Sequence, residues 1–206
     1  MQAALETVRE DGLAAASART IAARAEVNQA LIFYHFQTVS GLLEAASNRA
    51  VDESVAHYRE AFAGSESLTD LLGVGRALHD RERRNGNVAL MAQLMSGARQ
   101  DPVLARASHY AVSAWTDEIA VALDRLLATS PVADLVDSAG LAHAVAAGFI
   151  GLELYDGVDP DGASRALETL DSLAQLIDFV DGLGPVARRA LRSQLGAASR
   201  PNRSRR

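Results

Sequence analysis

The sequence predicts an all-helical protein, and three observations support this fold class. Alanine and leucine are abundant along the 206 residues, which favours helices. Clusters of β-branched residues, Asn-Gly hairpin signals and strict polar–apolar alternation, the signals of strands, are scarce. Glycine and proline punctuate the chain at intervals that divide it into helical lengths. We therefore expect about nine helices and no sheet.

The chain begins with two predicted short helices. The first covers about 2–11 and stops at Gly12, because glycine can adopt the left-handed conformation that closes a helix. Ser17 is the expected N-cap of the second, since its hydroxyl can accept a hydrogen bond from an unpaired backbone N–H. We expect this second helix to end near Ala25.

A third short helix and a long one complete the predicted N-terminal module. Asn28 is the expected cap of a helix over about 29–35, only a few residues after the second helix. Either Thr38 or Ser40 then caps a longer helix that reaches about Phe62.

The rest of the chain predicts a larger helical domain. We expect helices at about 68–84, 87–98, 102–128, 134–156 and 162–182, with a further candidate at 185–195. The predicted organisation is a module over 1–45, a helical ligand-binding and dimerisation domain over 46–195, and a disordered basic tail over 196–206.

Composition excludes several classes of protein. Cysteine is absent, so disulfides, zinc–thiolate sites and thiol nucleophiles are excluded, and we expect a cytoplasmic protein. Neither a signal peptide nor an uncharged membrane-spanning run is apparent, so we expect no membrane partner. Sequence motifs of phosphate loops, nucleophile elbows and zinc proteases are missing. We therefore expect no enzyme, no cofactor, no metal and no catalytic residue.

The segment from Ser17 to Phe36 carries the functional signal. Two short helices joined by so tight a turn must cross steeply, as in a helix-turn-helix. Four residues of its first half are expected to pack inward against Ile32 and Phe36: Ile21, Ala22, Ala25 and Val27. The opposite face of the second helix then presents Gln29, Leu31, Phe33, Tyr34 and His35.

Gln29 is the best candidate for a base contact. A helix in the major groove reads bases with side chains near its N-terminus, and glutamine can make two hydrogen bonds to adenine. Apolar side chains can contact the methyl group of thymine. The alternative is an ordinary helical bundle in which Phe33, Tyr34 and Phe36 are core aromatics.

This segment resembles the TetR family of bacterial repressors without a gap over about 25 residues. The matching residues are Ile21, Ala22, Ala25, Val27, Ile32, His35, Phe36, Thr38 and Leu42. The resemblance implies a double-stranded DNA operator as partner and places Gln29, Ala30 and Leu31 at the bases. It also implies contacts at or near phosphates for Ser17, Arg19, Phe33, Tyr34 and Thr38. The predicted DNA-binding set is completed by Asn28 and His35.

The segment departs from the family pattern at three positions. Glu26 stands where the turn glycine is usual, Phe33 lacks the hydroxyl of the usual tyrosine, and Val39 replaces a lysine. The chain also begins inside the first helix of the family, so we expect a longer natural N-terminus that carries a basic arm. Residues 1–45 contain more acidic than basic side chains, which weakens attraction to phosphates.

Dimerisation is expected from two apolar helices near the C-terminus. Gly140, Ala144 and Gly148 recur at four-residue steps, which would let another helix approach closely. The next helix carries an apolar seam at Ala166, Leu170, Leu173, Ile177 and Val180. The resemblance implies that two such helix pairs form a homodimer. The alternative is that both seams are buried within one chain.

A small apolar or amphipathic effector is the remaining expected partner. By the architecture of the family, a cavity in the larger domain is lined by Met91, Met95, Trp115, Ile119 and Phe149. Methionine adapts to irregular spaces and tryptophan offers a polar N–H, which suits such a cavity. The alternative is that these side chains are plain core.

The resulting hypothesis is a ligand-responsive repressor that releases its operator when the effector binds. The second hypothesis is a helical small-molecule-binding or interaction protein on the same scaffold, with weak or lost DNA binding. The acidic module and Val39 favour the second hypothesis, whereas the gapless match favours the first.

Overall fold

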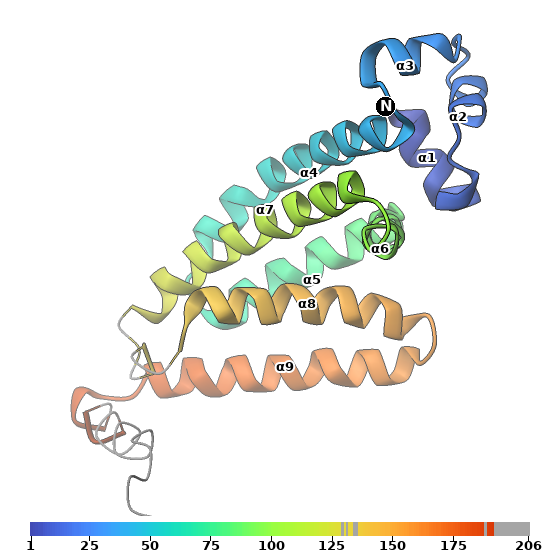
Figure 1. The fold of residues 1–206 in the computed structure, drawn as a ribbon. Helices are drawn as coiled ribbons and strands as arrows, with labels where there is room; N and C mark the ends of the chain where they lie inside the picture. The colour runs from blue at the N-terminus through green and yellow to red at the C-terminus, as the bar shows by residue number, and fades with distance from the viewer. Residues whose placement is uncertain (129, 131, 134–135, 188, 192–206) are drawn as a thin grey trace, which may run out of the picture.

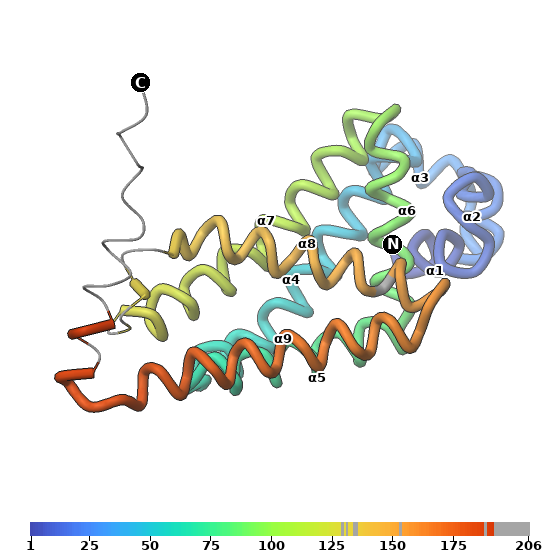
Figure 2. The backbone as a smooth tube through the Cα atoms, turned by 90° about the horizontal axis from the view of Figure 1, so that it is seen from below, coloured from blue at the N-terminus to red at the C-terminus, as the bar shows by residue number. Residues whose placement is uncertain are grey.

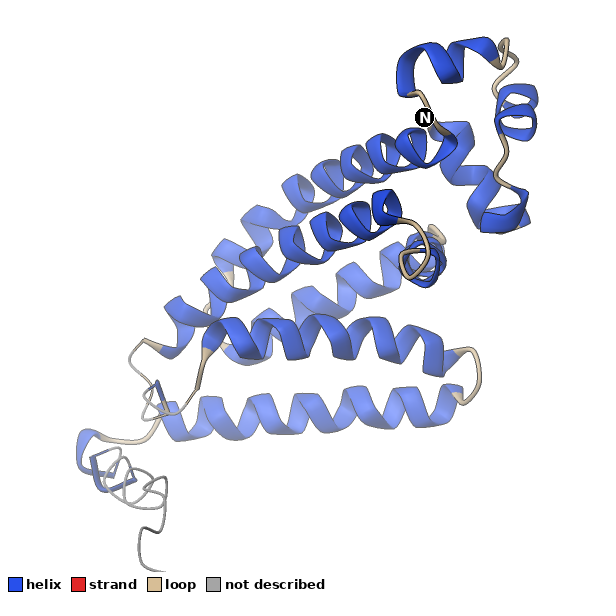
Figure 3. Ribbon diagram, viewed as in Figure 1, coloured by secondary structure: helices blue, strands red, loops and turns tan. Residues whose placement is uncertain are grey.

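The computed structural model describes residues 1–128, 130, 132–133, 136–187 and 189–191. Within these residues the chain forms nine α-helices and the 3-10 turn η1, with further helical residues at 185–187 and 189–191, and without a strand (Figure 3). The helices are α1 Gln2–Asp11, α2 Ala18–Arg24, α3 Ala30–Phe36, α4 Val39–Gly64, α5 Leu68–Arg84, α6 Asn87–Gly97, α7 Pro102–Leu127, α8 Ser138–Asp156 and α9 Pro160–Asp181; the 3-10 turn η1 is Leu13–Ala15. The all-helical fold class is confirmed.

Two parts of the prediction lie outside the described residues. They are the basic tail over 196–206, and residues 188 and 192–195 of the candidate helix at 185–195. The predicted start of the eighth helix at residue 134 also falls there, and the described helix α8 begins at Ser138.

Local capping explains where the N-terminal helices begin and end. The Ser17 hydroxyl accepts a hydrogen bond from the backbone N–H of Thr20 at 3.1 Å and caps α2. The Thr38 hydroxyl accepts one from the backbone N–H of Gly41 at 2.9 Å and caps α4. Thr38, rather than Ser40, is therefore the cap. Gly12 ends α1 with a φ of +86°, a conformation that favours glycine.

The C-terminal helices begin at similar signals. Side-chain oxygens of Ser67, Asp101 and Asp159 accept hydrogen bonds from the first turns of α5, α7 and α9. Proline occupies the start of α7 and α9, where its missing N–H removes no helical hydrogen bond. These signals are local, which is why helix starts near residues 68, 102 and 162 can be predicted from the sequence.

The helices are arranged as a small module at one end of a longer bundle. In Figure 1 α1, α2 and α3 lie at one end, and α4 leads from them into the bundle with α7 beside it. Helices α8 and α9 run side by side on the opposite flank, and α9 also packs against α5 (Figures 1 and 2).

The N-terminal module shares its core with the bundle. Leu5 and Val8 of α1 cluster with Ile21 of α2 and Ile32 of α3. The same cluster includes residues of α4, α6 and α7, namely Leu42, Leu43, Ala46, Leu90, Leu94 and Leu104. A second and a third cluster fill the bundle around Phe62, Ile119 and Leu123 and around Val51, Val55 and Ala111. The N-terminal module and the bundle are thus joined by packing as well as by the chain, and the division at 45/46 stays a prediction.

Two of the residues expected to pack inward are exposed. Ala25 and Val27 lie at the surface, so this part of the prediction is wrong. Ala25 is already the C-terminal cap of α2 and Val27 lies in the turn. Ile21 and Ile32 instead find their apolar partners on α1 and α4, which supply a wider surface than the turn could.

Candidate nucleic-acid interface

The turn between α2 and α3 is short and adopts a glycine-like conformation. Glu26 has a φ of +54°, in the left-handed region that costs a non-glycine residue roughly 1–2 kcal/mol. The backbone N–H of Val27 donates to the carbonyl of Ala22 at 3.0 Å, and the Asn28 side chain accepts from the N–H of Ala30 at 2.9 Å. The Asn28 side chain, which the sequence predicts to cap α3, thus bonds to the first residue of α3 from the position before the N-cap residue Gln29, and Glu26 stands at the strained position.

Helix α3 presents nearly its whole surface to solvent. Ile32 is its one buried residue, and Phe36 is half-buried against the first core. By contrast, Leu31 is 46%, Phe33 50% and Tyr34 81% exposed. The interpretation of Phe33 and Tyr34 as core aromatics is therefore wrong, because the helix rests on the module by one narrow apolar edge.

All residues of the predicted DNA-binding set lie on the surface. They are Ser17, Arg19, Asn28, Gln29, Ala30, Leu31, Phe33, Tyr34, His35 and Thr38. The start of α2, the turn and α3 bring them together at the end of the molecule (Figure 1). Such an array suits contact with a surface as broad as a DNA groove, and contact itself stays a prediction.

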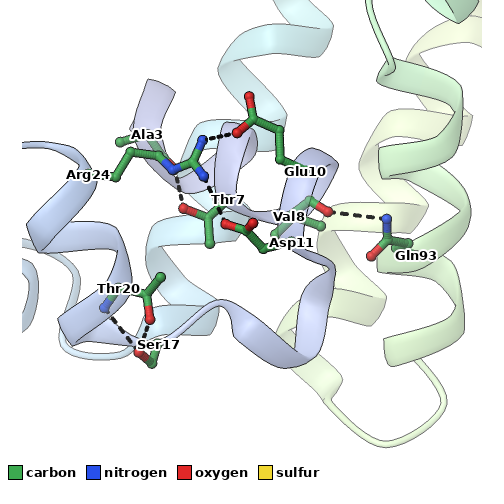
Figure 4. A network of polar contacts seen from close by, with 9 residues as sticks. All are labelled: Ala3, Thr7, Val8, Glu10, Asp11, Ser17, Thr20, Arg24 and Gln93. Carbon is green, nitrogen blue, oxygen red and sulfur yellow. Dashed lines mark hydrogen bonds and ion pairs between the residues drawn. The ribbon is translucent and has the colours of Figure 1, made fainter.

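The positive charge of this module is largely engaged within the protein. The Arg24 guanidinium forms ion pairs with Glu10 at 2.5 Å and Asp11 at 2.8 Å (Figure 4), and the hydrogen bond that it donates to Glu10 leads the effects that raise the pKa of Arg24. Arg9 donates to Asn87 at 2.5 Å. Among the described residues of the module, Arg19 is the arginine whose side chain makes neither a hydrogen bond nor an ion pair.

Two of the surface grooves in the described part of the bundle lie between pairs of helices. One, of about 390 Å³, lies between α4 and α7 and is lined by Asp52, Val55, Ala56, Arg59, Tyr110, Ala114, Asp117 and Glu118. The other, of about 540 Å³, lies between α8 and α9 and is lined by Gly148, Gly151, Leu152, Tyr155, Ala166, Thr169 and Leu170. The first groove could not be predicted from the sequence, because its lining residues come from α4 and α7, which are distant in the chain and meet only through packing.

The five predicted effector contacts do not line either groove. Met91 and Trp115 are half-buried and pack on the third core cluster, and Ile119 is buried in the second. Phe149 lies against His79, with 5.6 Å between the ring centroids. Met95 is exposed. The structure therefore brings Met91, Trp115 and Ile119 into adjoining core, and their role in binding stays a prediction.

Helices α8 and α9 carry a broad apolar surface without a partner in the described part of the chain. Of the predicted seam on α9, Leu170 and Leu173 are exposed, whereas Ala166, Ile177 and Val180 are half-buried. The exposed stripe continues instead through Leu176, 58% exposed, and Phe179, 68% exposed. The seam is thus rotated from the predicted one, because α5 and α8 cover one side of α9.

Two further features bear on partners. No group of three or more His, Asp or Glu side chains in the described part of the chain could hold a metal ion. Helix α8 is long and apolar enough, by length and composition alone, to cross a membrane. Only 6% of that stretch is buried within the chain. A helix face that packs against another protein chain has the same composition.

Comparisons with known proteins agree with this arrangement. Residues 1–46 match the family of bacterial regulatory proteins named tetR, and no curated protein matches the sequence. A protein assigned as a TetR-family transcriptional regulator from Rhodococcus sp. has a similar structure, with a TM-score of 0.70, 25% identity, and 85% of this chain and 94% of that chain covered.

Two more solved structures are similar. The transcriptional regulator SCO7518 from Streptomyces coelicolor A3(2) has a TM-score of 0.62 and 25% identity, over 84% of this chain and 94% of that chain. The fatty acid degradation regulator FadR from Bacillus halodurans has a TM-score of 0.66 over 84% of this chain and 94% of that chain. Its 13% identity supports the fold alone.

Proposed function

We propose that this chain, whose residues 1–46 match the family of bacterial regulatory proteins named tetR and whose fold is similar to that of a TetR-family transcriptional regulator, is a ligand-responsive repressor. In this proposal a homodimer binds a double-stranded DNA operator through α3 and releases it when a small apolar or amphipathic molecule binds the bundle. The observation that carries the proposal is the exposure of nearly the whole of α3 at the tip of the module.

Gln29 and the apolar side chains beside it read the bases in this proposal. Gln29 lies at the N-terminal end of α3, where a helix in the major groove meets base edges, and its amide suits adenine. Ala30 and Leu31 are exposed next to it and suit thymine methyl groups. Ser17, Arg19, Asn28, Phe33, Tyr34, His35 and Thr38 then lie toward the backbone of the duplex.

The apolar face of α8 and α9 supplies the homodimer contact. One α3 engages one half-site, so two copies held at a fixed separation of about 34–36 Å are needed for successive major grooves. The stripe from Leu170 to Phe179 and the groove against α8 are exposed and apolar. A second copy that covers them would remove this surface from water.

The effector is proposed to act by shifting the population between two arrangements of the dimer. A ligand that binds more tightly when the recognition helices no longer match successive grooves lowers affinity for DNA. Met91, Met95, Trp115, Ile119 and Phe149 are the proposed contacts. Of these, Trp115 and Ile119 lie on α7, which packs along α4, the helix that leads into the module. The protein is proposed to be cytoplasmic and to have no catalytic role.

The experiment for this function compares substitutions in α3 with one outside it. Gln29→Ala and Tyr34→Ala should each weaken binding to the operator about tenfold, the order of one good base or backbone contact. Gln100→Ala is the matched control, because Gln100 is exposed and lies outside the module. Affinity is measured by fluorescence anisotropy, with helicity and dimer mass measured beside it.

An unchanged affinity for both α3 variants would contradict the proposed base-reading helix. The second function, a small-molecule-binding or interaction protein without DNA binding, is favoured by the ion pairs that hold Arg24 away from phosphates. It predicts that the unaltered chain binds no duplex selectively at low salt.

A further inference from the structure

Gln93 on α6 uses both ends of its side-chain amide to hold the break between α1 and η1. Its Oε1 accepts a hydrogen bond from the backbone N–H of Leu13 at 2.8 Å. Its Nε2 donates to the carbonyl of Val8 at 3.2 Å, a contact that Figure 4 shows. Both bonds are partly buried and join residues 80 and 85 positions apart.

The break needs such a partner because the regular helical ladder stops there. Gly12, with a φ of +86°, turns the chain out of α1, and a buried backbone N–H or carbonyl without a partner is costly. The Val8 carbonyl already accepts from the backbone N–H of Gly12 at 3.1 Å. Gln93 therefore supplies the acceptor to Leu13 and a second donor to Val8. A glutamine amide can do both, whereas a carboxylate of the same length can only accept.

A second polar contact fastens the same two parts. Nη2 of Arg9 donates to Oδ1 of Asn87 at 2.5 Å, and Asn87 in turn donates to Glu82 of α5. Asn87 and Gln93 are six residues apart, so they lie about 9 Å apart along the axis of α6. Leu90 and Leu94, which lie between or next to them, are buried in the core of the module.

Helix α6 therefore connects the module to the bundle independently of α4. The chain itself joins the two parts only through α4, which alone would leave the module free to pivot about that helix. Met91 of α6 packs against the third core cluster of the bundle. A movement of α6 in the bundle would reach the module through Gln93 and Asn87 as well as through the shared core at Leu90 and Leu94.

We propose that Gln93 is a positioning residue that fixes the angle of the N-terminal module on α6, and with it the separation of the two α3 helices in the dimer. The inference rests on the proposed function, since it concerns the spacing of operator half-sites. In this proposal the preferred spacing between half-sites depends on Gln93, which lies on α6, outside the predicted DNA-binding residues.

The experiment measures spacing preference directly. The operator is first selected from random-sequence duplexes with the unaltered chain. Two further duplexes then carry one base pair more or fewer between the half-sites, which shifts each half-site by about 3.4 Å and rotates it by about 35°. The measured quantity is the ratio of affinities for the natural and altered spacings.

Gln93→Met keeps the length of the side chain and removes both hydrogen bonds. We expect it to reduce the spacing preference roughly tenfold, the order of losing such a pair of bonds, mainly by weakening binding at the natural spacing. Gln93→Glu keeps the acceptor for Leu13. Its spacing preference should therefore lie between those of the unaltered chain and Gln93→Met. Gln100→Met is the matched control and should keep the unaltered preference.

A second variant, Asn87→Leu, and hydrogen exchange distinguish a loss of positioning from unfolding of the Gln93→Met variant. Asn87→Leu breaks the contact with Arg9 and leaves Gln93 in place, so it should lower the spacing preference without loss of helicity. In Gln93→Met the amide of Leu13 should exchange faster while amides inside α7 keep their protection.

The outcomes distinguish failure of the proposed function from failure of the proposed role of Gln93. If the unaltered chain selects no duplex, the proposed function fails and this inference fails with it. If an operator is selected and the folded Gln93 and Asn87 variants keep the preference of the unaltered chain, the inference alone is overturned. A reduced preference in both, with the Gln100 control unchanged, supports it.

Discussion

The guanidinium of Arg24 on α2 lies 2.5 Å from a carboxylate oxygen of Glu10 on α1. Asp11 completes the pair from the other side at 2.8 Å (Figure 4). An arginine that neutralises two carboxylates of its own chain is a poor partner for a phosphate. Electrostatic attraction to DNA therefore depends on the few cations that remain at the surface, of which Arg19 is one.

Substitution of the two arginines should affect salt dependence differently. Each phosphate contact contributes about −0.9 to the slope of log affinity against log salt. Arg19→Ala should therefore make the slope shallower by about 2 for a dimer. Arg24→Ala should leave the slope nearly unchanged, because Arg24 is already paired. Titrations of the operator complex with NaCl measure both, and equal changes would contradict this assignment.

Glu26→Gly should strengthen DNA binding. The substitution removes an acidic charge beside the duplex and relieves a left-handed φ of +54°, while the greater freedom of glycine in the unfolded chain offsets part of the gain. The free energy of unfolding should change by less than about 1 kcal/mol.

Glu26→Gln separates the two effects. It removes the charge and keeps the strained backbone, so it should raise operator affinity about as much as Glu26→Gly. Weaker binding by both variants, measured at low salt, would show that the turn does not face DNA.

Leu176→Glu should dissociate the homodimer. Leu176 lies in the middle of the exposed stripe on α9, where a buried, unpaired carboxylate would be costly. Loss of bivalent binding should lower operator affinity about 100-fold or more. Light scattering after chromatography gives the mass. Val121→Glu is the control, because Val121 is 68% exposed on α7, outside this face, and a monomeric control would contradict the assigned interface.

Asp178→Asn should destabilise the bundle near neutral pH. The Asp178 carboxylate on α9 accepts from the backbone N–H groups of Leu68 and Thr69 at 3.0 and 2.9 Å and so caps α5 from another helix. Burial raises the pKa of Asp178, but the hydrogen bonds from Thr69 and Leu68 outweigh it and lower the pKa overall. Loss of such a cap costs about 0.5–2 kcal/mol.

The sign of the pH effect follows from that lowered pKa. The unfolded carboxyl has a pKa of about 3.9, so this stabilisation is present above that pH and is lost as the pH falls through the lower pKa of the folded state. Urea denaturation should show a difference between the two chains at pH 7 that shrinks below about pH 4. Asp124→Asn, at an exposed position, is the control; a difference that grows on acidification would contradict the capping role.

Sequence alone predicts the helices because their signals are local. Gly12, Ser17 and Thr38 end or begin helices through atoms within four residues of themselves. The exposed face of α3 does not follow from its hydrophobic pattern, since Leu31, Phe33 and Tyr34 are apolar or aromatic and yet exposed. The helix-turn-helix spacing of the segment is what predicts it.

The contacts between distant helices could not be predicted in this way. In the sequence Gln93 is an ordinary helical glutamine. Its contact with Val8, 85 positions away, exists only because α6 lies against α1. The exposed stripe on α9 includes Leu176 and Phe179 because α5 and α8 cover other residues. Helical period shows which residues share a face, but only packing decides which face is covered.

The most direct test of the central claim is selection of operators from random-sequence duplexes by the purified chain. The account predicts enrichment of an inverted repeat whose half-sites lie one helical turn, about 10–10.5 base pairs, or a multiple of it apart. That duplex should bind the unaltered chain in dimeric units and lose affinity with Gln29→Ala. Enrichment of no sequence, or of a single unrepeated site bound by one chain, would contradict it.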